Sequence, residues 1–388
     1  MTMLRPENEA QLAEAVAGAK GALRVQGGGT RMNGLELGAQ VLTTAGLNGI
    51  TLYEPGSLTL VAGAGTPVAE IETTLDAEGQ RLAYEPMDHR TLLGTSGVPT
   101  IGGVVAGNVS GPRRVAVGAC RDFVLGVRFV DGSGQIIKNG GRVMKNVTGY
   151  DLVKLMAGSF GTLGVLSEVS LKVLPKPEMT ASLMLYWSKA NVDDSAAVSA
   201  LSAALGSPYE VTGAAHFSHS DVGWPISVIR VEGTEASVTY RLGKLQALLA
   251  GYGDVVLLND PKKVEKQWQT IRDVSEWQCS PYDIWRLSVK PSDASGIVAR
   301  MPRETSVFYD WGGGLIWAAC EMGTDLRAKI GAFSGHATLV HTLQDTPLNF
   351  SRFHPEPAPI AALTAGLRNK FDPREILNPG LMGQPYEN

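Results

Sequence analysis

The stretch that decides the fold runs from Thr100 to Pro175 and reads TIGGVVAGNVSGPRRVAVGACRDFVLGVRFVDGSGQIIKNGGRVMKNVTGYDLVKLMAGSFGTLGVLSEVSLKVLP. It opens with a segment that we interpret as a loop, because it contains Gly102, Gly103 and Gly107. Residues without a Cβ let backbone N–H groups approach a bulky anion closely. A predicted strand and a tight turn follow this segment.

A second glycine cluster closes the same stretch. A short helix is predicted from Asp151 to Ala157, and Gly158 ends it. The sequence GSFGTLG then leads into VLSEVSLKV, whose alternating apolar residues predict a strand. Two glycine-rich segments beside strands predict a cradle for one extended, phosphate-bearing cofactor.

A third glycine segment lies nearer the start of the chain. Gly27, Gly28 and Gly29 directly follow the predicted strand LRVQ, and Thr30 and Arg31 come next. A pyrophosphate needs several N–H donors at close range, which a glycine run provides without side-chain obstruction. An ordinary turn is the alternative interpretation. The presence of all three segments in one half of the chain favours the cofactor site.

Composition narrows the class of protein. The chain has 388 residues, of which 44% are hydrophobic and 19% are charged, as expected for two or three globular domains. A net charge of −4 gives no electrostatic argument for nucleic acid. A GxGxxG fingerprint after a strand and a GxxxxGK[ST] phosphate loop are both missing, which argues against a Rossmann or P-loop nucleotide site.

Cysteine usage and hydropathy bear on the compartment. Cys120, Cys279 and Cys320 form no CxxC pair, so the sequence predicts no local iron–sulfur or zinc site and no disulfide framework. The first residues lack the apolar core of a signal peptide, and no apolar run approaches the ~18 residues of a membrane span. We expect a cytoplasmic protein with no transmembrane segment.

The chain divides at a stiff proline pair. Pro175 and Pro177 end the first predicted domain, 1–176, in which helices and strands do not form a regular βαβ repeat. From 177 to 357, strands alternate with helices, which predicts a second α+β domain with a sheet covered by helices on one face. We find no internal sequence repeat. The tail, 358–388, is predicted to pack against the first domain.

Several polar residues are candidates for chemistry, each with an ordinary alternative. Arg286 lies inside the apolar strand IWRLSV and could anchor a substrate carboxylate or form a pair at the sheet surface. Adjacent Arg113 and Arg114 could contact phosphate, a carboxylate or a partner protein, or form a solvated turn. His89 could face a cofactor ring or be a plain loop histidine.

The remaining histidines raise the question of a metal. His216 and His219 lie three apart, and His336 and His341 lie close together after Gly335. The spacing of the first pair does not converge in a strand-to-loop context, and no HExxH motif occurs. We predict no metal site.

The glycine segments resemble those of the vanillyl-alcohol-oxidase type, or PCMH-type, FAD-binding family. The motifs that carry the resemblance are RVQGGGT (24–30), TIGGVVAGN (100–108), GYDLVKLMAGSFGTLGVLSEVSLKVLP (149–175) and LRNKFDPREILNPG (367–380). The resemblance implies an α+β fold, in which a two-subdomain FAD-binding domain is followed by a second α+β, ferredoxin-like domain that covers the substrate.

The resemblance also implies which residues contact FAD. In chain order, the first glycine segment (27–31) and the second (100–108) would bind the pyrophosphate, the third (161–165) would lie along the adenosine half, and the tail would approach the flavin. The first loop continues with Arg31-Met32-Asn33 and offers neither His nor Cys, so non-covalent FAD is expected. The residues expected at FAD are Gly27, Gly28, Gly29, Thr30, Arg31, Thr100, Ile101, Gly102, Gly103, Gly107, Asn108, Gly111, Gly161, Thr162, Gly164, Val165 and Asn378.

More narrowly, SGPRR (110–114), CRDFVLGVRFVDGSG (120–134) and GGRVMKNVTGYDL (140–152) resemble the FAD-binding E subunits of bacterial glycolate oxidase. This implies oxidation of glycolate, or a similar small 2-hydroxy acid, to glyoxylate, with electrons leaving through the flavin to a partner. The implied partners are a second flavin subunit and an iron–sulfur subunit, through which the complex would contact the inner face of the membrane. Arg286 and His89 are the catalytic candidates.

One departure from the wider family leaves alternatives open. Related catalytic 2-hydroxyacid dehydrogenases carry a His-rich metal cluster, of which SGHATLVH (334–341) keeps little. The chain could therefore bind FAD without carrying the main substrate site. A self-sufficient FAD-linked D-2-hydroxyacid dehydrogenase and a flavin-free structural subunit are the alternatives.

Overall fold

A computed structural model describes residues 3–31, 40–143, 149–187, 193–218, 225–343 and 348–382. The chain packs into two compact units. Unit 1 contains residues 1–110, 119–176 and 355–388, and unit 2 contains 111–118 and 177–354. The domain boundaries expected from the sequence stay a prediction, and they did not foresee that the short segment 111–118 belongs with unit 2.

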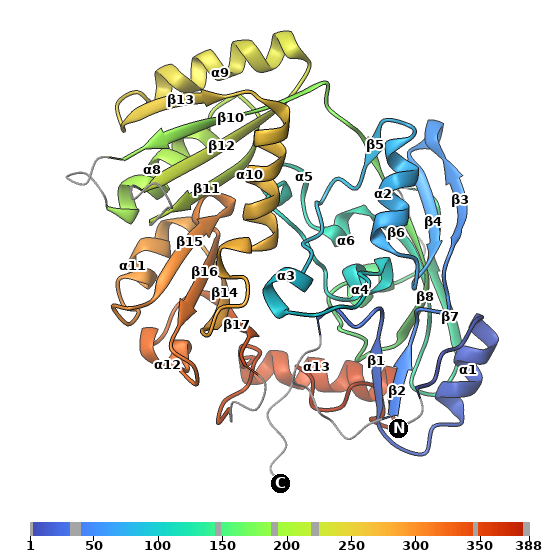
Figure 1. The fold of residues 1–388 in the computed structure, drawn as a ribbon. Coiled ribbons are helices and arrows are strands. Elements are labelled where there is room, and N and C mark those ends of the chain that lie inside the picture. The colour runs from blue at the N-terminus through green and yellow to red at the C-terminus, as the bar shows by residue number, and fades with distance from the viewer. Residues whose placement is uncertain are drawn as a thin grey trace. The chain divides into compact units, whose positions relative to one another are not determined.

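Unit 1 is built around a five-stranded antiparallel sheet, with strand order β3-β4-β8-β6-β7 (Figure 1). Its strands are β3 (Ile50–Glu54), β4 (Thr59–Gly63), β6 (Val124–Val130), β7 (Ile136–Gly140) and β8 (Val165–Lys172). Two small sheets accompany it: β1 (Leu23–Gln26) pairs in parallel with β2 (Gln40–Thr43), and β5 (Gln80–Arg81) pairs with β9 (Leu174–Pro175).

The helices of unit 1 are mostly short. They are α1 (Glu9–Ala17), α2 (Val68–Asp76), α3 (Arg90–Leu93), α4 (Ile101–Ala106), α6 (Cys120–Phe123), α7 (Leu152–Met156) and α13 (Ala358–Phe371), with a 3₁₀ turn at Pro55–Ser57. The helix predicted after Asp151 is present, and the Asp151 carboxylate accepts a hydrogen bond from the Lys154 N–H as an N-cap does.

The sequence prediction of a loop from Thr100 to Gly107 is wrong, because these residues form helix α4. Thr100 is its N-cap, and the Thr100 hydroxyl accepts from the Gly103 N–H at 3.4 Å. Gly102 packs so closely on Ala64 that an added Cβ would lie 2.6 Å from the Ala64 Cβ. The glycines therefore allow the helix to approach the sheet, whereas we interpreted them as signs of irregular backbone.

The tail returns to the first strand of unit 1. Leu377 bridges to Leu23, the Asn378 N–H donates to the Leu23 carbonyl at 2.9 Å, and the Asn378 amide oxygen accepts from the Val25 N–H at 2.8 Å. Asn378 is fully buried. Residues 353 positions apart thus complete one small strand assembly.

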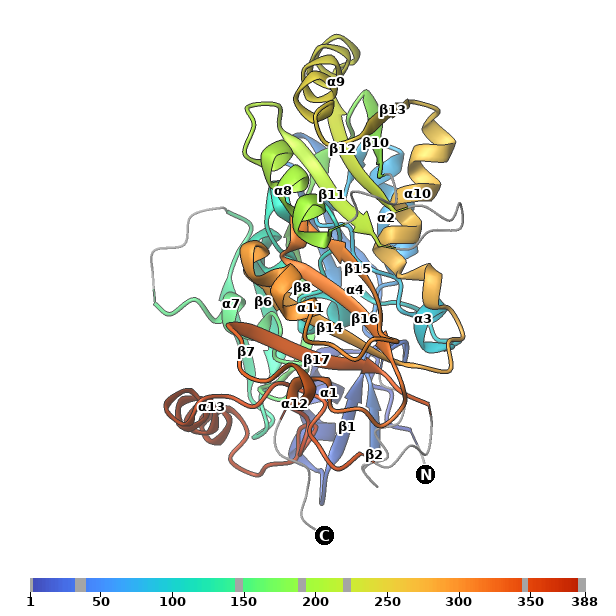
Figure 2. The ribbon, with the colours of Figure 1, turned by 90° about the vertical axis from the view of Figure 1, so that its left-hand side faces the viewer.

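Unit 2 is one eight-stranded antiparallel sheet, with strand order β13-β10-β12-β11-β15-β16-β14-β17 (Figure 2). Its strands are β10 (Met179–Tyr186), β11 (Val211–Phe217), β12 (Ile226–Gly233), β13 (Asp254–Leu258), β14 (Asp283–Val289), β15 (Ser306–Asp310), β16 (Leu315–Cys320) and β17 (Gly335–His341). Its helices are α5 (Arg114–Val117), α8 (Asp194–Leu205), α9 (Glu235–Leu249), α10 (Pro261–Asp273), α11 (Ala294–Val298) and α12 (Leu326–Ile330), with 3₁₀ turns η3 (Ser275–Trp277), η4 (Pro291–Asp293) and η5 (Trp311–Gly313).

This sheet consists of two consecutive βαββαβ units. In the first, β10-α8-β11-β12-α9-β13, and in the second, β14-α11-β15-β16-α12-β17, the strands follow the same ferredoxin-like order. The two halves join edge to edge through β11 and β15. The prediction of a ferredoxin-like α+β fold is confirmed, and the topology repeats although no sequence repeat is visible.

The two faces of the sheet differ. One face is apolar along its whole width and packs on α8, α9, α11 and α12. On the other face, α10 lies over the first half, where the Trp268 indole N–H donates to Ser182 at 2.8 Å. The second half of that face carries Phe308, Trp317, Arg286 and Thr338 in register across four strands.

Candidate functional site

The three glycine segments meet within unit 1. The Val98 N–H donates to the Gly28 carbonyl at 3.1 Å, just before α4 begins. Behind α4, the Gly158 N–H donates to Val105 at 3.2 Å and the Phe160 N–H donates to Ala106 at 2.9 Å. The end of β1, α4 and the turn before β8 therefore form one contiguous structure.

The first glycine segment presents free donors. Within the described ranges, the backbone N–H groups of residues 27–31 have no hydrogen-bond acceptor, although the Gly27 and Thr30 carbonyls accept from Thr43 and Thr95. Five consecutive amides without acceptors form the type of concave donor surface that binds an anion. This backbone fits the pyrophosphate of a dinucleotide.

Gly28 shows why this turn has the shape it has. A Cβ added there would lie 1.7 Å from the Val98 carbonyl oxygen, so only glycine allows the two backbones to meet. The Cα of Gly28 therefore packs against the Val98 backbone on the side where another residue would carry a Cβ. The backbone N–H groups of the turn are left to bind a ligand.

Arg31 adds a positive charge beside these amides. Its guanidinium donates to the Gly103 carbonyl at 2.5 Å, and lies 5.8 Å from the centre of the Phe160 ring. A Cβ on Gly107 would lie 2.1 Å from the guanidinium, so the arginine occupies the space that this glycine leaves. Burial lowers the pKa of Arg31 to about 10, and the group stays protonated at neutral pH. A buried cation next to free amides suits a phosphate.

The third segment and the tail are joined by Asn378. Its amide nitrogen donates to the Phe160 carbonyl at 2.8 Å and lies 3.2 Å from the position of a Cβ on Gly161. Thr162 donates to Ser159 at 2.7 Å, and a Cβ on Gly164 would contact the Phe129 ring at 2.6 Å. These side chains already bond to protein, so their contact with FAD stays a prediction.

Other predicted FAD residues are distributed as follows. Thr100 and Ile101 begin α4, and Val165 begins β8, where it pairs with Val130. Asn108 follows α4, and its amide oxygen accepts from the Arg121 N–H at 3.0 Å. Gly111 belongs to unit 2, where its carbonyl accepts from the Trp311 indole at 3.1 Å. Unit 1 therefore brings together all the residues predicted at FAD except Gly111.

The two adjacent arginines have different environments in unit 2. The Arg113 guanidinium forms a two-pronged pair with the buried Glu232 carboxylate, with a shortest distance of 2.7 Å. Arg114 lies over the Trp311 ring, with its guanidinium carbon 4.6 Å from the ring centre. Arg113 holds segment 111–118 on the sheet, and Arg114 is the one that extends over an aromatic surface.

Arg286 lies near Arg114. Its guanidinium carbon is 5.1 Å from the centre of the same Trp311 ring. Burial, then repulsion by Arg114, lowers the pKa of Arg286 to about 10, while Asp310 acts in the opposite direction. Among the described residues no acceptor bonds the Arg286 side chain.

The histidines are dispersed. His89 precedes α3 in unit 1, with its Nδ1 3.2 Å from the Met87 carbonyl oxygen. His216 is fully buried and bonds Ser227 at 2.9 Å, while His219 lies outside the described residues. Within the described ranges, no three His, Cys, Asp or Glu side chains gather as metal ligands.

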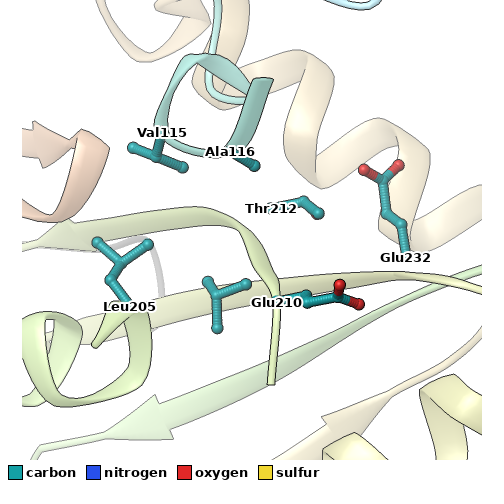
Figure 3. A pocket seen from close by; sticks show the side chains of 7 residues that line it. Val115, Ala116, Leu205, Glu210, Thr212 and Glu232 are labelled. Atoms are coloured by element: carbon teal, nitrogen blue, oxygen red, sulfur yellow. The ribbon is translucent and has the colours of Figure 1, made fainter. Parts of the chain in front are cut away.

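One pocket of about 580 Å³ lies in unit 2 (Figure 3). Val115 and Ala116 of α5 line one side, and Leu205, Thr212 and the two carboxylates Glu210 and Glu232 line the other. The Glu232 carboxylate already pairs with Arg113. The Glu210 carboxylate likewise pairs with Arg241 at 3.1 Å, so these ion pairs are already formed within the protein, and we do not place the anionic substrate there.

With the geometry described, the class of protein follows from comparison with known proteins. Residues 2–140 match the family described as FAD binding domain, and the fold resembles that of alkyldihydroxyacetonephosphate synthase, with a TM-score of 0.70 at 15% identity over 97% of this chain and 76% of that chain. A chitooligosaccharide oxidase structure has a TM-score of 0.66 at 15% identity, over 99% of this chain and 91% of that one. FAD as the cofactor and the PCMH-type fold are therefore confirmed.

The particular family is shown by a longer sequence match. The chain is 35% identical to the glycolate oxidase subunit GlcE of Escherichia coli over 337 residues, which cover 86% of this chain and 84% of that protein. It belongs to the family of that subunit. It is also 33% identical to the glycolate oxidase subunit GlcD of Bacillus subtilis, but over 41% of this chain and 32% of that protein. The expected class of FAD-linked oxidoreductases of 2-hydroxy acids is confirmed.

The sequence did not reveal the side chains that surround Arg286. Trp311 has a positive φ of 53°, which is rare for an aromatic residue, and Gly312 and Gly313 beside it also have positive φ. The signal that could have pointed to it is the run WGGG at 311–314, which a search for glycine-rich turns would find. The proximity of Arg114 could not be inferred, because nearly 200 residues separate it from Trp311.

In the described parts of the chain, no helix has the length and the apolar character that a membrane span requires.

Proposed function

We propose that this chain is the FAD-binding subunit of a glycolate oxidase complex that oxidises glycolate to glyoxylate. The observation that carries the proposal is the extent of the similarity to GlcE, which spans too much of the chain to be confined to unit 1. Similarity to GlcD and to the D-lactate dehydrogenase of Anaerostipes hadrus covers 41% and 40% of this chain. The similarity to GlcE thus extends into the second half of this chain.

The residues that would hold FAD are those of the joined glycine segments. The free amides of residues 27–31 and the Arg31 guanidinium would bind the pyrophosphate, and the turn at 161–165 would lie along the adenosine half. Bound FAD supplies the two-electron acceptor for the α-carbon hydride of the acid. Attachment would be non-covalent, since the loop offers Arg31 where covalent relatives use a nucleophile.

We also propose the partners and the place of action. A second flavin subunit and an iron–sulfur subunit would complete the complex. The names of the relatives GlcE and GlcD as glycolate oxidase subunits support an assembly of several subunits, and the iron–sulfur subunit follows from the resemblance described above. The complex would act in the cytoplasm and would contact the inner face of the membrane through those partners.

The catalytic assignments Arg286 and His89 remain proposals. Arg286 is offered as the anchor of the substrate carboxylate and His89 as a residue that faces the flavin. For His89, replacement by Gln should shift the absorbance bands of bound FAD, whereas the same change at the half-buried His354 of unit 2 should not. If the flavin absorbance bands of the His89→Gln variant are the same as those of the His354→Gln variant, His89 does not face the flavin.

The proposed function is tested by purification of the full chain with and without its partner subunits. We expect stoichiometric FAD on the isolated chain, and glycolate-dependent reduction of a dye only when the partners are present. Dye reduction by the chain alone would indicate a self-sufficient dehydrogenase. A chain that binds no FAD after reconstitution would indicate a structural subunit and would overturn the proposal.

A further inference from the structure

We propose that the half-face of the unit 2 sheet that carries Arg286 holds a binding site for one small monocarboxylate with an adjacent hydroxyl or oxo group, formed by Arg286, Arg114 and Trp311, with His336 at its edge. The inference rests on the proposed function in one respect, because the proposed function supplies the 2-hydroxy acid as the ligand. Every residue in it belongs to unit 2.

The first argument is the pairing of two like charges on one ring. The guanidinium carbons of Arg114 and Arg286 lie 4.6 and 5.1 Å from the centre of the Trp311 ring. Cation–π attraction offsets part of the cost of desolvating each cation, but the two guanidinium groups repel each other. Such an arrangement is stabilised when an anion lies between or beside them.

The second argument is the charge balance. The charged groups that act on Arg286 are Arg114 and Asp310, and Asp310 is the single carboxylate among them. Asp310 is buried, and its carboxylate already accepts a hydrogen bond from the backbone N–H of Trp311 at 2.7 Å. The Arg286 guanidinium is thus repelled by Arg114, and a monoanion beside it would oppose that repulsion. The Arg286 side chain, which bonds no acceptor in the described residues, offers a planar fork suited to a carboxylate.

The third argument is the way Trp311 is held. Asp310 ends β15, and the chain then turns through Trp311, Gly312 and Gly313, all with positive φ. The indole N–H is fixed by the Gly111 carbonyl at 3.1 Å. A non-glycine residue in the left-handed region is strained, and such strain concentrates at ligand sites. The turn therefore holds an aromatic ring in place under the two cations.

The polar groups beside Arg286 suit the rest of the acid. Arg286 and Ser288 of β14 lie opposite Thr338 and His336 of β17, so all four occupy one face of the sheet. His336 lies at the exposed end of β17, yet its pKa is lowered, first by desolvation and then by Arg286, His354 and Arg114. His336 is therefore uncharged at neutral pH and can accept a hydrogen bond from the hydroxyl of the acid.

The test uses the full chain reconstituted with FAD and measures binding by calorimetry with glycolate as the probe. Glycolamide, which has the same shape and hydroxyl but no charge, is the matched ligand control. Wild type should bind glycolate and not glycolamide. Arg286→Gln should weaken glycolate binding at least about tenfold, as expected for a lost charge-assisted pair. Arg300→Gln, at an exposed position of the same unit, should bind as wild type does.

If Arg286→Gln does not fold, Arg114→Gln serves instead, and Arg286→Lys should show intermediate binding because it keeps the charge and loses the fork. Equal binding of glycolate and glycolamide, no binding of glycolate by wild type, or undiminished binding in the Gln variant would overturn the site. FAD content is measured on the same samples. Full FAD without glycolate binding overturns this inference alone, and lack of FAD overturns the proposed function.

Discussion

Gly28 is the residue on which the geometry of the free amides depends. The Gly28 backbone approaches the Val98 carbonyl so closely that no other residue fits, and the Val98 N–H returns a hydrogen bond to the Gly28 carbonyl. This close approach fixes the turn after β1 against the segment that enters α4. A change there should therefore affect both stability and the donor array.

Gly28→Ala is expected to lower the free energy of unfolding by roughly 3 kcal/mol, because the methyl group would overlap backbone that cannot move without loss of the turn. Gly21→Ala is the control: nothing lies within 4 Å of the added methyl group, and its effect should stay within about 0.5 kcal/mol. Chemical denaturation of both variants measures the difference. Equal stability of the two would show that the close approach is not needed.

Arg31 gives a second prediction for a single residue. Arg31→Met keeps much of the side-chain volume and removes the buried charge, so FAD should bind about tenfold more weakly. Lys20→Met removes an exposed charge in the same unit and should leave FAD affinity unchanged. Flavin fluorescence titration reports both. Undiminished affinity in Arg31→Met would show that the backbone amides alone hold the pyrophosphate.

Among elements, the N-terminus of α8 is joined to the sheet by a buried polar network. The Tyr309 hydroxyl donates to the Asp194 carboxylate at 2.7 Å, and His216 Nε2 lies 3.9 Å from the other oxygen of that carboxylate. The Trp187 indole and His216 both bond the Ser227 hydroxyl, at 3.0 and 2.9 Å. Burial lowers the pKa of His216 from 6.5 to about 4, while Asp194 opposes the shift.

This network makes stability depend on pH in a definite direction. Below pH 6.5 the unfolded chain binds a proton at His216 that the folded chain does not bind until about pH 4. Stability is therefore full above pH 6.5 and falls as the pH drops toward 4, by at most about 3 kcal/mol from this group. His216→Gln should lose that part of the pH dependence in denaturation curves. An unchanged slope between pH 6.5 and 4 would contradict the assignment.

Elements also show where sequence reasoning succeeds and where it fails. The alternation of VLSEVSLKV predicts β8, and Asp151 correctly marks the start of α7, because both signals are local. The glycines of α4 misled us, since the contact that requires Gly102 comes from Ala64, across the fold. The two βαββαβ halves were missed because strand order repeats in space while the side chains that fill each half differ.

At the scale of the whole molecule, the cofactor should contribute to the stability of the folded chain. A ligand that binds the native state at about a hundred times its Kd adds about 2.7 kcal/mol. We expect removal of FAD to lower the unfolding temperature and its return to restore it, with a smaller recovery in Arg31→Met at equal FAD. An unfolding temperature independent of FAD would mean that the glycine segments do not bind it.

The fold of the whole molecule also determines how much of the FAD site and of the Arg286 site can be predicted from the sequence. The residues predicted at FAD could be named from the sequence because their glycine motifs are contiguous in the chain. Arg286 was noticed as a charge in an apolar strand, but Arg114, Trp311 and His336 come from three other elements, and only the folded sheet places them beside it. Contacts between segments so distant in the chain leave no local pattern to recognise.

The bond between Val25 and Asn378 has a consequence for biosynthesis. The ribosome releases the first partner 353 residues before the second, which at elongation rates of about 5–20 residues per second is a delay of roughly 20–70 s. During that interval the nascent chain can complete the residues between the two partners, while β1 lacks its partner Asn378. We therefore expect the flavin to be loaded only after Asn378 has been synthesised, and a chain truncated before Asn378 to take up no cofactor.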